Sequence, residues 1–214
     1  MILADEAAAR RWVSELPGRD GAAMERLDLL ATMLAEENAR QNLVAASSLD
    51  RVWQRHIADS AQLLTHVPRG TSPVWLDLGT GAGFPGLVIA ALRPDLDITM
   101  VESRARRIEW LNRAREALGL ERAKVAGTRL ESVEARAVDV ISGRAFAPLD
   151  ALLTASARFS TGATLWLLPK GRSAAKELAE LRGWSHLFHV EHSVTDSEAG
   201  IVVGTLAGRK GSKA

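Results

Sequence analysis

Alternate positions of one short segment carry an acid and three glycines, namely Asp77, Gly79, Gly81 and Gly83. The segment follows an apolar run at residues 74–78 that is typical of a buried strand, and the apolar residues 87–92 after it are typical of a helix. Glycine has no Cβ and adopts positive φ at no steric cost, so a ligand can approach such a loop closely. Pro85 suits the first helical position, because its φ is fixed near the helical value. A strand, glycine loop and helix in this order form the nucleotide-binding corner of an open α/β sheet.

Two kinds of nucleotide ligand fit these glycines. The spacing Gly81-x-Gly83-x-x-Gly86 satisfies the dinucleotide fingerprint, which is a weak signal when taken alone. The frame that begins at Asp77 resembles motif I of the methyltransferases that use S-adenosylmethionine (SAM), and we expect the acid and the three glycines to bind this cofactor. Glu102 ends the next predicted strand, where it would accept hydrogen bonds from the ribose hydroxyls. An acid at this place also suits NAD, and the alternative is that it caps the following helix.

Composition places the chain among ordinary globular proteins. Its 214 residues suit one domain with a helical appendage, and 47% of them are apolar and 25% charged. A membrane-spanning helix needs about 18 or more consecutive apolar residues, and the chain has no such run. The first residues are acidic where a secretory signal would be basic, so we expect a cytoplasmic protein.

The chain has no cysteine, which removes several chemistries together. Disulfides, cysteine-ligated zinc or iron–sulfur clusters and thiolate nucleophiles are all excluded. A methyltransferase of this kind cannot attack a pyrimidine through a cysteine adduct, so the methyl acceptor must itself be nucleophilic. The net charge is only +1, so any nucleic-acid surface must come from local basic clusters.

Residues 1–70 show helical spacing and no strand signal, so we expect a helical cap before a methyltransferase domain at residues 71–207 and a basic tail at residues 208–214. Three cap helices are predicted, near residues 7–13, 24–43 and 49–64. His56 and Ser60 lie four residues apart on one face of the third. His56 could act as an acid or base, but a helix histidine beside a tryptophan is more often packed and hydrogen bonded.

The remaining pattern predicts a Rossmann-like α/β fold of the class I SAM-dependent methyltransferase type, mostly parallel with an antiparallel edge. Strands are expected at residues 74–78, 97–102, 123–126, 137–141, 163–168, 185–192 and 200–206. Weak helical spacing at residues 132–135 and helices at 103–119, 151–159 and 173–181 would connect them. On a continuous strand His189 would point away from His186 and His192, so one metal ion could not bind all three, and we expect no metal.

Several polar residues follow the carboxyl ends of these strands. Leu130 and Glu131 follow the third strand, where the side chain and backbone N–H of Leu130 and the Glu131 carboxylate would meet adenine; the alternative is a plain polar loop. The helix at 103–119 carries five arginines, of which Arg104 and Arg107 are candidates for RNA phosphates unless the helix is simply solvated. The segment 142–149 should face the transferred methyl group.

A family resemblance rests on motifs that occur in one order. They are Asn42-Leu43, Arg55-His56-Ile57-Ala58-Asp59-Ser60, Asp77 to Gly86, Arg93-Pro94, Ser142 to Ala147 and Pro169-Lys170-Gly171. Together they resemble the bacterial small-subunit ribosomal RNA guanine-N7 methyltransferases, the RsmG or glucose-inhibited division protein B family, over about residues 24–206. The resemblance implies methyl transfer from SAM to N7 of a guanosine in the 530 loop of 16S rRNA. It also implies SAM contacts at Gly79, Phe84, Leu130, Glu131 and Arg144.

This chemistry asks little of the protein beyond alignment. N7 of guanine carries an in-plane lone pair and no proton, so it can attack a sulfonium methyl without a general base. Arg144 or Lys170 would orient the guanine or its neighbouring phosphates, and Arg144 and Lys170 are therefore the catalytic candidates. The alternative for Lys170 is a solvated loop lysine. We expect a monomer that acts on 16S rRNA or the assembling 30S subunit, without a membrane or a metal.

Two other classes stay open on sequence alone. An NAD(P)-dependent oxidoreductase is supported only by the spacing from Gly81 to Gly86, and the chain has no tyrosine for a Tyr-x-x-x-Lys pair. A protein with a SAM-binding fold that binds RNA without catalysis is the third class, although the intact cofactor loop argues against it.

Overall fold

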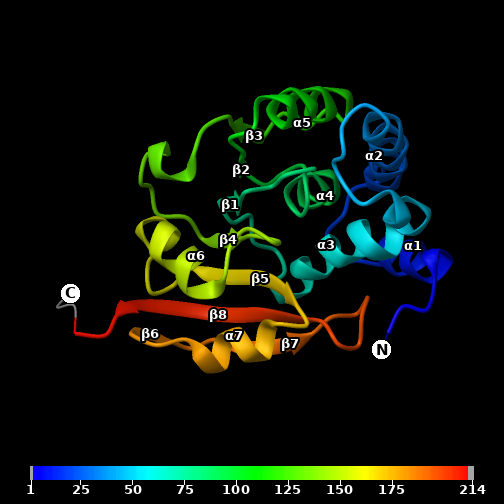
Figure 1. Ribbon diagram of the computed structural model, residues 1–214. Helices are drawn as coiled ribbons and strands as arrows, with labels where there is room; N and C mark the ends of the chain where they lie inside the picture. The colour runs from blue at the N-terminus through cyan, green and yellow to red at the C-terminus, as the bar shows by residue number, and fades with distance from the viewer. Residues whose placement is uncertain (1, 212–214) are drawn as a thin grey trace.

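A single mixed sheet organises the computed structural model, which describes residues 2–211 (Figure 1). Its eight strands follow the order β3-β2-β1-β4-β5-β8-β6, with β7 also paired to β8. The first five are parallel to one another, and β8 runs antiparallel to β5, β6 and β7. The strands are β1 Trp75–Leu78, β2 Ile98–Val101, β3 Ala123–Ala126, β4 Val140–Ser142, β5 Leu165–Gly171, β6 Trp184–His186, β7 His189–His192 and β8 Gly200–Arg209. This is the predicted Rossmann-like arrangement, and the antiparallel edge is confirmed.

Helices cover both faces of the sheet. Two helices follow β1 and β2 and pack in one hydrophobic cluster with the helical cap, while two others pack on the opposite face. The first group is α4 Gly86–Leu92 and α5 Ala105–Ala117, joined by α1 Glu6–Ser14, α2 Ala23–Asn38 and α3 Asp59–Ala61. The second group is α6 Leu149–Ser156 and α7 Ala174–Glu180. Residues alternate accordingly along β1, where Trp75 belongs to the first cluster and Leu76 to the second.

The helical cap shares its core with the sheet. Leu27, Leu34 and Ile57 from the cap are fully buried in the same cluster as Leu87 and Ile89 from α4. Burying one such side chain stabilises the fold by about 1.5–3 kcal/mol. The predicted boundary at residue 70 therefore marks a change from helices to strands within one continuous core.

The third cap helix differs from the uniform helix predicted at residues 49–64. It is a chain of unlike turns: a 3-10 turn over Ala46–Arg51, a π-helical turn over Trp53–Ala58, α3, and a second 3-10 turn over Gln62–His66. The carboxylate of Glu6 accepts hydrogen bonds from the backbone N–H groups of Trp53 and Gln54 at 2.8 and 2.7 Å, at the start of the π-helical turn. Single π-helical turns are frequent at functional sites. This one carries Arg55 and His56 toward the carboxyl edge of the sheet.

The end of the chain also departs from expectation. The strand predicted at residues 185–192 is broken into β6 and β7, and β8 continues to Arg209. Gly208 and Arg209 were expected in the basic tail, but the Arg209 guanidinium lies 4.5 Å from the Trp184 ring and donates to the Thr154 hydroxyl. Residues 212–214 of the predicted tail lie outside the described part of the chain.

Two general features of residues 2–211 bear on ligands and location. No helix among them is long and apolar enough to cross a membrane. In the same range, no three His, Cys, Asp or Glu side chains are grouped so that they could hold a metal ion.

Candidate active site

The backbone of the glycine loop is left-handed at all three glycines, with φ of 60° at Gly79, 61° at Gly81 and 102° at Gly83. Residues with a Cβ rarely adopt this region, so the loop requires glycine here. A Cβ on Gly79 would lie 2.3 Å from the ring of Phe146, and one on Gly83 would lie 2.3 Å from Leu87. The absence of a side chain at Gly79 therefore lets the Phe146 ring of the segment after β4 pack directly on the loop, and Gly83 likewise allows close packing of α4.

Gly86 is explained by packing alone. A Cβ on Gly86 would lie 2.5 Å from Met100 of β2 and 2.9 Å from the Asp77 carboxylate. The helix α4 begins at Gly86, one residue later than predicted. Pro85 is therefore the N-cap and not the first helical residue. The third glycine of the dinucleotide spacing thus has a structural reason that involves no dinucleotide.

Asp77 lies beneath the loop in the interior. Its carboxylate is fully buried and accepts hydrogen bonds from the Ser142 hydroxyl at 2.7 Å and from the Gly86 backbone N–H at 3.0 Å. Ser142 in turn accepts a hydrogen bond from the Trp75 indole at 2.8 Å. This network joins β1, β4 and the start of α4. In this arrangement the Asp77 carboxylate holds the loop and the start of α4 in place, and a direct contact between Asp77 and the cofactor stays a prediction.

Burial raises the pKa of Asp77 to about 6, against the lowering effect of its hydrogen bonds. The folded protein then binds more protons than the unfolded chain between about pH 4 and 6, so stability falls as the pH rises through this window. Relative to Asp77→Asn, which cannot titrate, the free energy of unfolding of the parent protein should fall by about 3 kcal/mol from pH 4 to 7. Urea unfolding of both proteins at each pH measures this. A difference that stays constant with pH would contradict it.

Glu102 follows β2 and faces the start of α5. Its Oε1 accepts hydrogen bonds from the backbone N–H groups of Ser103 at 2.7 Å and Arg104 at 2.9 Å, and its Oε2 lies 3.8 Å from Arg107. The helix-capping alternative is therefore present in the structure. Arg107 also lies 3.4 Å from the place of a Cβ on Gly81, beside the loop rather than on an outer surface for RNA phosphates. A ribose contact through Glu102 Oε2 stays a prediction.

Leu130 and Glu131, the two residues predicted to contact adenine, lie on the turn after β3. Leu130 begins a single 3-10 turn that ends at Ser132, and the helical spacing predicted over residues 132–135 does not form a helix. The Leu130 side chain is buried in the cluster on the α6 face, and the Glu131 side chain is exposed. For the Leu130 side chain to pack on the adenine ring, it would have to leave this cluster. Contacts from its backbone and from Glu131 stay predictions.

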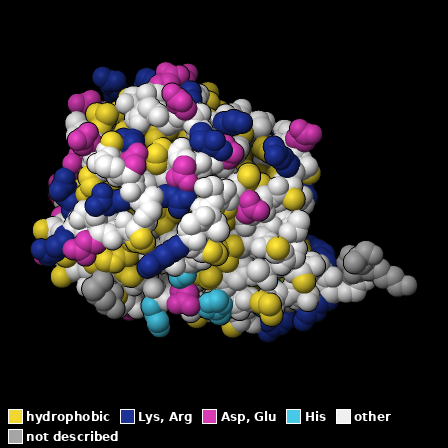
Figure 2. All heavy atoms as spheres, turned by 180° about the vertical axis from the view of Figure 1, so that it is seen from behind, with side chains coloured by type: hydrophobic (Ala, Val, Ile, Leu, Met, Phe, Trp, Pro, Cys, Tyr) yellow, Lys and Arg dark blue, Asp and Glu magenta, His cyan; other side chains and the backbone are white. Residues whose placement is uncertain are grey.

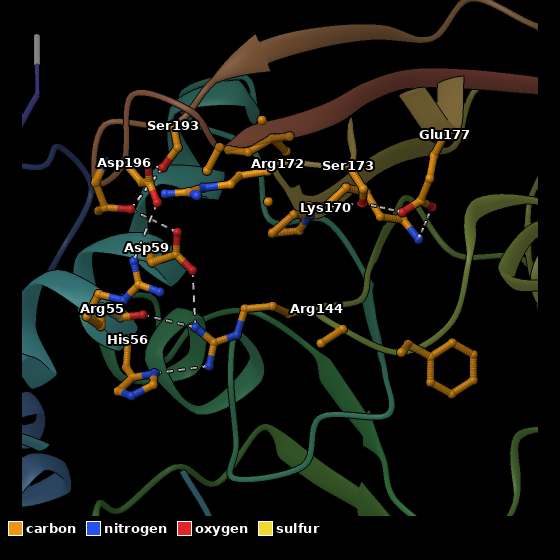
Figure 3. A pocket seen from close by; sticks show the side chains of 18 of the residues that line it. Arg55, His56, Asp59, Arg144, Lys170, Arg172, Ser173, Glu177, Ser193 and Asp196 are labelled. Carbon is orange, nitrogen blue, oxygen red and sulfur yellow. Dashed lines mark hydrogen bonds and ion pairs between the residues drawn. The ribbon is translucent and has the colours of Figure 1, made fainter. Parts of the chain in front are cut away.

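Arg144 joins the glycine loop to the helical cap. Its guanidinium lies 4.9 Å from the centre of the Phe84 ring and donates hydrogen bonds to the Asp59 carboxylate at 3.1 Å and to the Arg55 carbonyl at 3.2 Å (Figure 3). Phe84 is buried, so its side chain supports Arg144 from below. The next residue, Ala145, has φ of 53°, which turns the backbone sharply after Arg144.

His56 packs between the same partners. Its ring stacks on Phe84 with 5.0 Å between centres, and Arg144 lies 3.3 Å from its Nδ1. Because the guanidinium can only donate, Nδ1 must accept, and Nε2–H then donates to the Ser48 hydroxyl at 2.8 Å. Burial lowers the pKa of His56 to about 3, with Arg144 and Arg55 adding to the effect. The packed alternative is confirmed, and both ring nitrogens are engaged.

Because His56 is neutral and packed, we expect that its ionisation does not affect the pH dependence of methyl transfer. A plot of kcat/KM against pH should show no rise with an apparent pKa near 6.5. The ring nitrogen signals of His56 should stay those of the neutral form between pH 5 and 8. NMR of the histidine rings, assigned with His56→Gln, measures this directly. A histidine titration at pH 6–7 that disappears in the variant would contradict the packed assignment.

Lys170 at the end of β5 is almost entirely buried, with 6% of its side chain exposed. Its ammonium lies 3.0 Å from the Glu177 carboxylate on α7 and donates to the Ala147 carbonyl. Glu177 also accepts a hydrogen bond from the Leu149 N–H at 2.7 Å. The alternative of a solvated loop lysine is therefore wrong. Lys170 secures the segment that follows Arg144, so it is a positioning residue rather than a free cation.

These residues surround a cleft of about 1040 Å³ at the carboxyl edge of the sheet. Its walls come from the π-helical turn with Arg55, His56 and Asp59, from the segment after β4, from the end of β5, and from the connection between β7 and β8 (Figure 3). Arg144, Phe146 and Lys170 line it, and the Phe146 ring lies against Gly79. Phe146 thus lies between the cleft, which it lines, and the glycine loop, which its ring contacts at Gly79.

The structure brings together some predicted residues and adds others. Arg144 and Lys170 line one cleft, whereas Glu102, Leu130 and Glu131 lie along the sheet edge toward β3. Sequence reasoning assigned no individual role to Ser142, Phe146 or Asp59, and it assigned Arg107 to RNA phosphates rather than to the loop. Ser142 and Phe146 lie in the segment expected to face the methyl group, so their place in the chain was a usable signal. The role of Asp59 depends on a partner 85 residues away and left no local signal.

The residues around the loop fit a nucleoside cofactor. Gly81 leaves the loop backbone uncovered beside the Arg107 guanidinium, which lies 3.4 Å from the place of a Cβ on Gly81 and 3.8 Å from the Glu102 carboxylate. The strand order and this loop at the end of β1 define a class I SAM-dependent methyltransferase. Residues 23–199 match the family described as rRNA small subunit methyltransferase G, and the chain belongs to that family.

Relatives and solved structures agree with this assignment. The chain is 59% identical to "Ribosomal RNA small subunit methyltransferase G" of Erythrobacter litoralis over 95% of this chain and 97% of the relative, and 56% identical to the protein of the same name from Novosphingobium aromaticivorans over 98% and 92%. The O-methyltransferase TomG from Streptomyces achromogenes, solved in complex with SAM, has a similar fold with a TM-score of 0.57 and 13% identity over 94% of this chain and 96% of that one. A putative O-methyltransferase from Klebsiella pneumoniae gives a TM-score of 0.55 at 16% identity, over 94% and 97%. The NAD(P)-dependent oxidoreductase and the non-catalytic RNA-binding protein are therefore the wrong classes.

Proposed function

We propose that this SAM-dependent rRNA methyltransferase transfers a methyl group to N7 of a guanosine in the 530 loop of 16S rRNA. The observation that supports it is the cleft beside the glycine loop, in which Arg144 lies between Phe84 of the loop and Asp59 of the cap. A guanidinium there can donate to the O6 edge of guanine, and such contacts discriminate bases by about 1–3 kcal/mol.

The side chains around the cleft suit an acceptor that needs no general base. His56 is neutral, with Nδ1 accepting from Arg144 and Nε2–H donating to Ser48. SAM supplies an electrophilic methyl group on a sulfonium, and N7 of guanine attacks it without losing a proton. Arg144 and the segment held by Lys170 would align the base, which is the contribution such a reaction requires. Because the product guanine gains positive charge, a cation at its O6 edge is tolerated better than one over its face.

Recognition would come from a local site rather than from a broad basic surface. The net charge is +1, and basic and acidic side chains intermingle on the face opposite to that of Figure 1 (Figure 2). A folded ribonucleoprotein would then contribute part of the contact surface. We propose that a monomer in the cytoplasm acts on the assembling 30S subunit or its 16S rRNA, with Gly79, Gly81, Gly83 and Phe84 at the cofactor.

The test is methylation of 30S particles and of naked 16S rRNA, both taken from cells that lack this enzyme, with SAM labelled on the methyl group. Digestion to nucleosides followed by mass spectrometry identifies the methylated atom, and strand cleavage at N7-methylguanosine identifies the position. We expect one N7-methylguanosine in the 530 loop. Label on another atom or in another region of the rRNA would overturn the proposal.

A further inference from the structure

Each cation that lines the cleft has a carboxylate partner. The four pairs are Arg144–Asp59 at 3.1 Å, Lys170–Glu177 at 3.0 Å, Arg55–Asp196 at 3.7 Å and Arg172–Glu198 at 2.6 Å. A cleft that receives a polyanion would be expected to present cations to it. Here the acids compensate those cations, and the pairs differ in how easily a phosphate could replace the acid.

Two of the pairs are largely buried, and two are exposed to solvent. The Arg144 and Lys170 pairs are at most 22% exposed and carry further hydrogen bonds. In the outer pairs, Arg55 and Asp196 are 46% and 26% exposed, and Arg172 and Glu198 are 73% and 63% exposed. Exposed pairs contribute little stability, since water competes for both charges. The outer pairs can therefore open at small cost.

Both outer acids belong to one segment, while their arginines belong to two separate elements. Asp196 and Glu198 lie on the connection between β7 and β8. Arg55 comes from the π-helical turn of the cap, and Arg172 directly follows β5. Figure 3 shows Arg172 extending across the cleft toward Asp196, with Arg55 on the cap side. One acidic segment thus covers a cation on each side of the cleft mouth.

We propose that Arg55 and Arg172 bind phosphodiester groups of the RNA strand that enters the cleft, and that Asp196 and Glu198 occupy them until the phosphates take their place. This proposal rests on the rRNA substrate proposed above. Arginine pairs with phosphate in a bidentate manner, and an RNA strand brings several phosphates at once, so exchange for an exposed carboxylate is favourable.

The acids have a consequence for selectivity. An RNA that reaches only one of the two arginines still meets the acid that covers the other, and like charges repel. An RNA whose shape seats a phosphate at both positions displaces the acidic segment as a whole. Asp196 and Glu198 therefore weaken the binding of unstructured RNA more than that of a fitting substrate.

Fluorescence anisotropy with a labelled, uridine-rich single-stranded RNA containing one central guanosine tests this in the full chain. Asp196→Asn combined with Glu198→Gln should tighten binding by about fivefold or more at low salt. Arg55→Gln combined with Arg172→Gln should weaken it by at least about tenfold and reduce the slope of log K against log salt by about 1.4, for two phosphates on a single strand. SAM affinity, measured in parallel, reports that each variant is folded.

A matched control separates this exchange from a general change of charge. Asp97 and Arg122 form an exposed pair at 2.7 Å by the amino end of β2, at the opposite edge of the sheet. Asp97→Asn and Arg122→Gln should leave binding within about twofold, because this pair lies at the opposite edge of the sheet from the cleft that receives the RNA. In the background without Arg55 and Arg172, neutralising Asp196 and Glu198 should no longer tighten binding.

Three results would overturn the proposal: acid variants that behave as Asp97→Asn does, arginine variants with the parental salt slope, or acid variants that still tighten binding without the arginines. These results do not depend on methylation. If N7-methylguanosine forms in the 530 loop but the acid variants have no effect, only this inference fails. If the exchange is observed but the label lies elsewhere, only the proposed methylation site fails.

Discussion

Gly79→Asp is expected to abolish SAM binding, with the dissociation constant raised at least about a hundredfold. The new Cβ would lie 2.3 Å from the Phe146 ring, and φ of 60° is unfavourable for a residue with a side chain. The Phe146 ring already occupies the place of the new side chain, so the loop and the segment after β4 would have to move apart. Isothermal titration with SAM measures the loss, and NADH should give no heat with either protein.

The control for this variant is Gly119→Asp. Gly119 has φ of 63°, close to that of Gly79, but nothing lies within 4 Å of its Cβ position, and it follows the far end of α5. The two variants share the backbone strain and the added charge and differ in what the side chain meets. Gly119→Asp should bind SAM as the parent does. SAM binding by Gly79→Asp within about threefold of the parent would show that the cofactor does not lie on this loop.

The strand, glycine loop and helix start that form the predicted cofactor site could be predicted from the sequence, because the residues that determine them are adjacent in the chain. The run from Asp77 to Gly86 contains the strand end, the left-handed glycines and the helix start within ten consecutive residues. The parallel order of the first strands follows from alternating strands and helices, since each crossover returns to the same sheet. These parts of the prediction needed no contact between distant residues.

The side-chain partners could not be read in the same way. The sequence placed Asp77 at a strand end, but its carboxylate accepts a hydrogen bond from the Ser142 hydroxyl, 65 residues away, which only the folded chain brings near. The partners of Glu102 are the N–H groups of the next two residues, and for that reason the capping alternative could be stated from the sequence. The π-helical turn at Trp53 depends on the carboxylate of Glu6, 47 residues earlier. Lys170 was as compatible with solvent as with burial until Glu177 on the next helix gave it a partner.

Arg144→Ala is expected to lower kcat/KM for methylation of 30S particles by about tenfold to hundredfold. The guanidinium contacts Phe84 of the loop and His56 and Asp59 of the cap in one cluster at the cleft, and we propose that it orients the guanine edge. Loss of one such bidentate contact costs about 1–3 kcal/mol, which sets this range. The family resemblance implies that SAM affinity falls as well, and titration with SAM separates the two effects.

Two further variants show whether the geometry of the guanidinium or only its charge matters. Arg144→Lys keeps the charge and loses the planar fork, so it should recover only part of the activity. Arg209→Ala removes a comparable arginine–aromatic contact, at 4.5 Å from Trp184 and far along β8 from the cleft, and should methylate as the parent does. If Arg144→Ala keeps parental turnover and parental SAM affinity, the base must be oriented by another residue of the cleft. A fall in SAM affinity without a further loss of turnover at saturating SAM would instead place Arg144 with the cofactor alone.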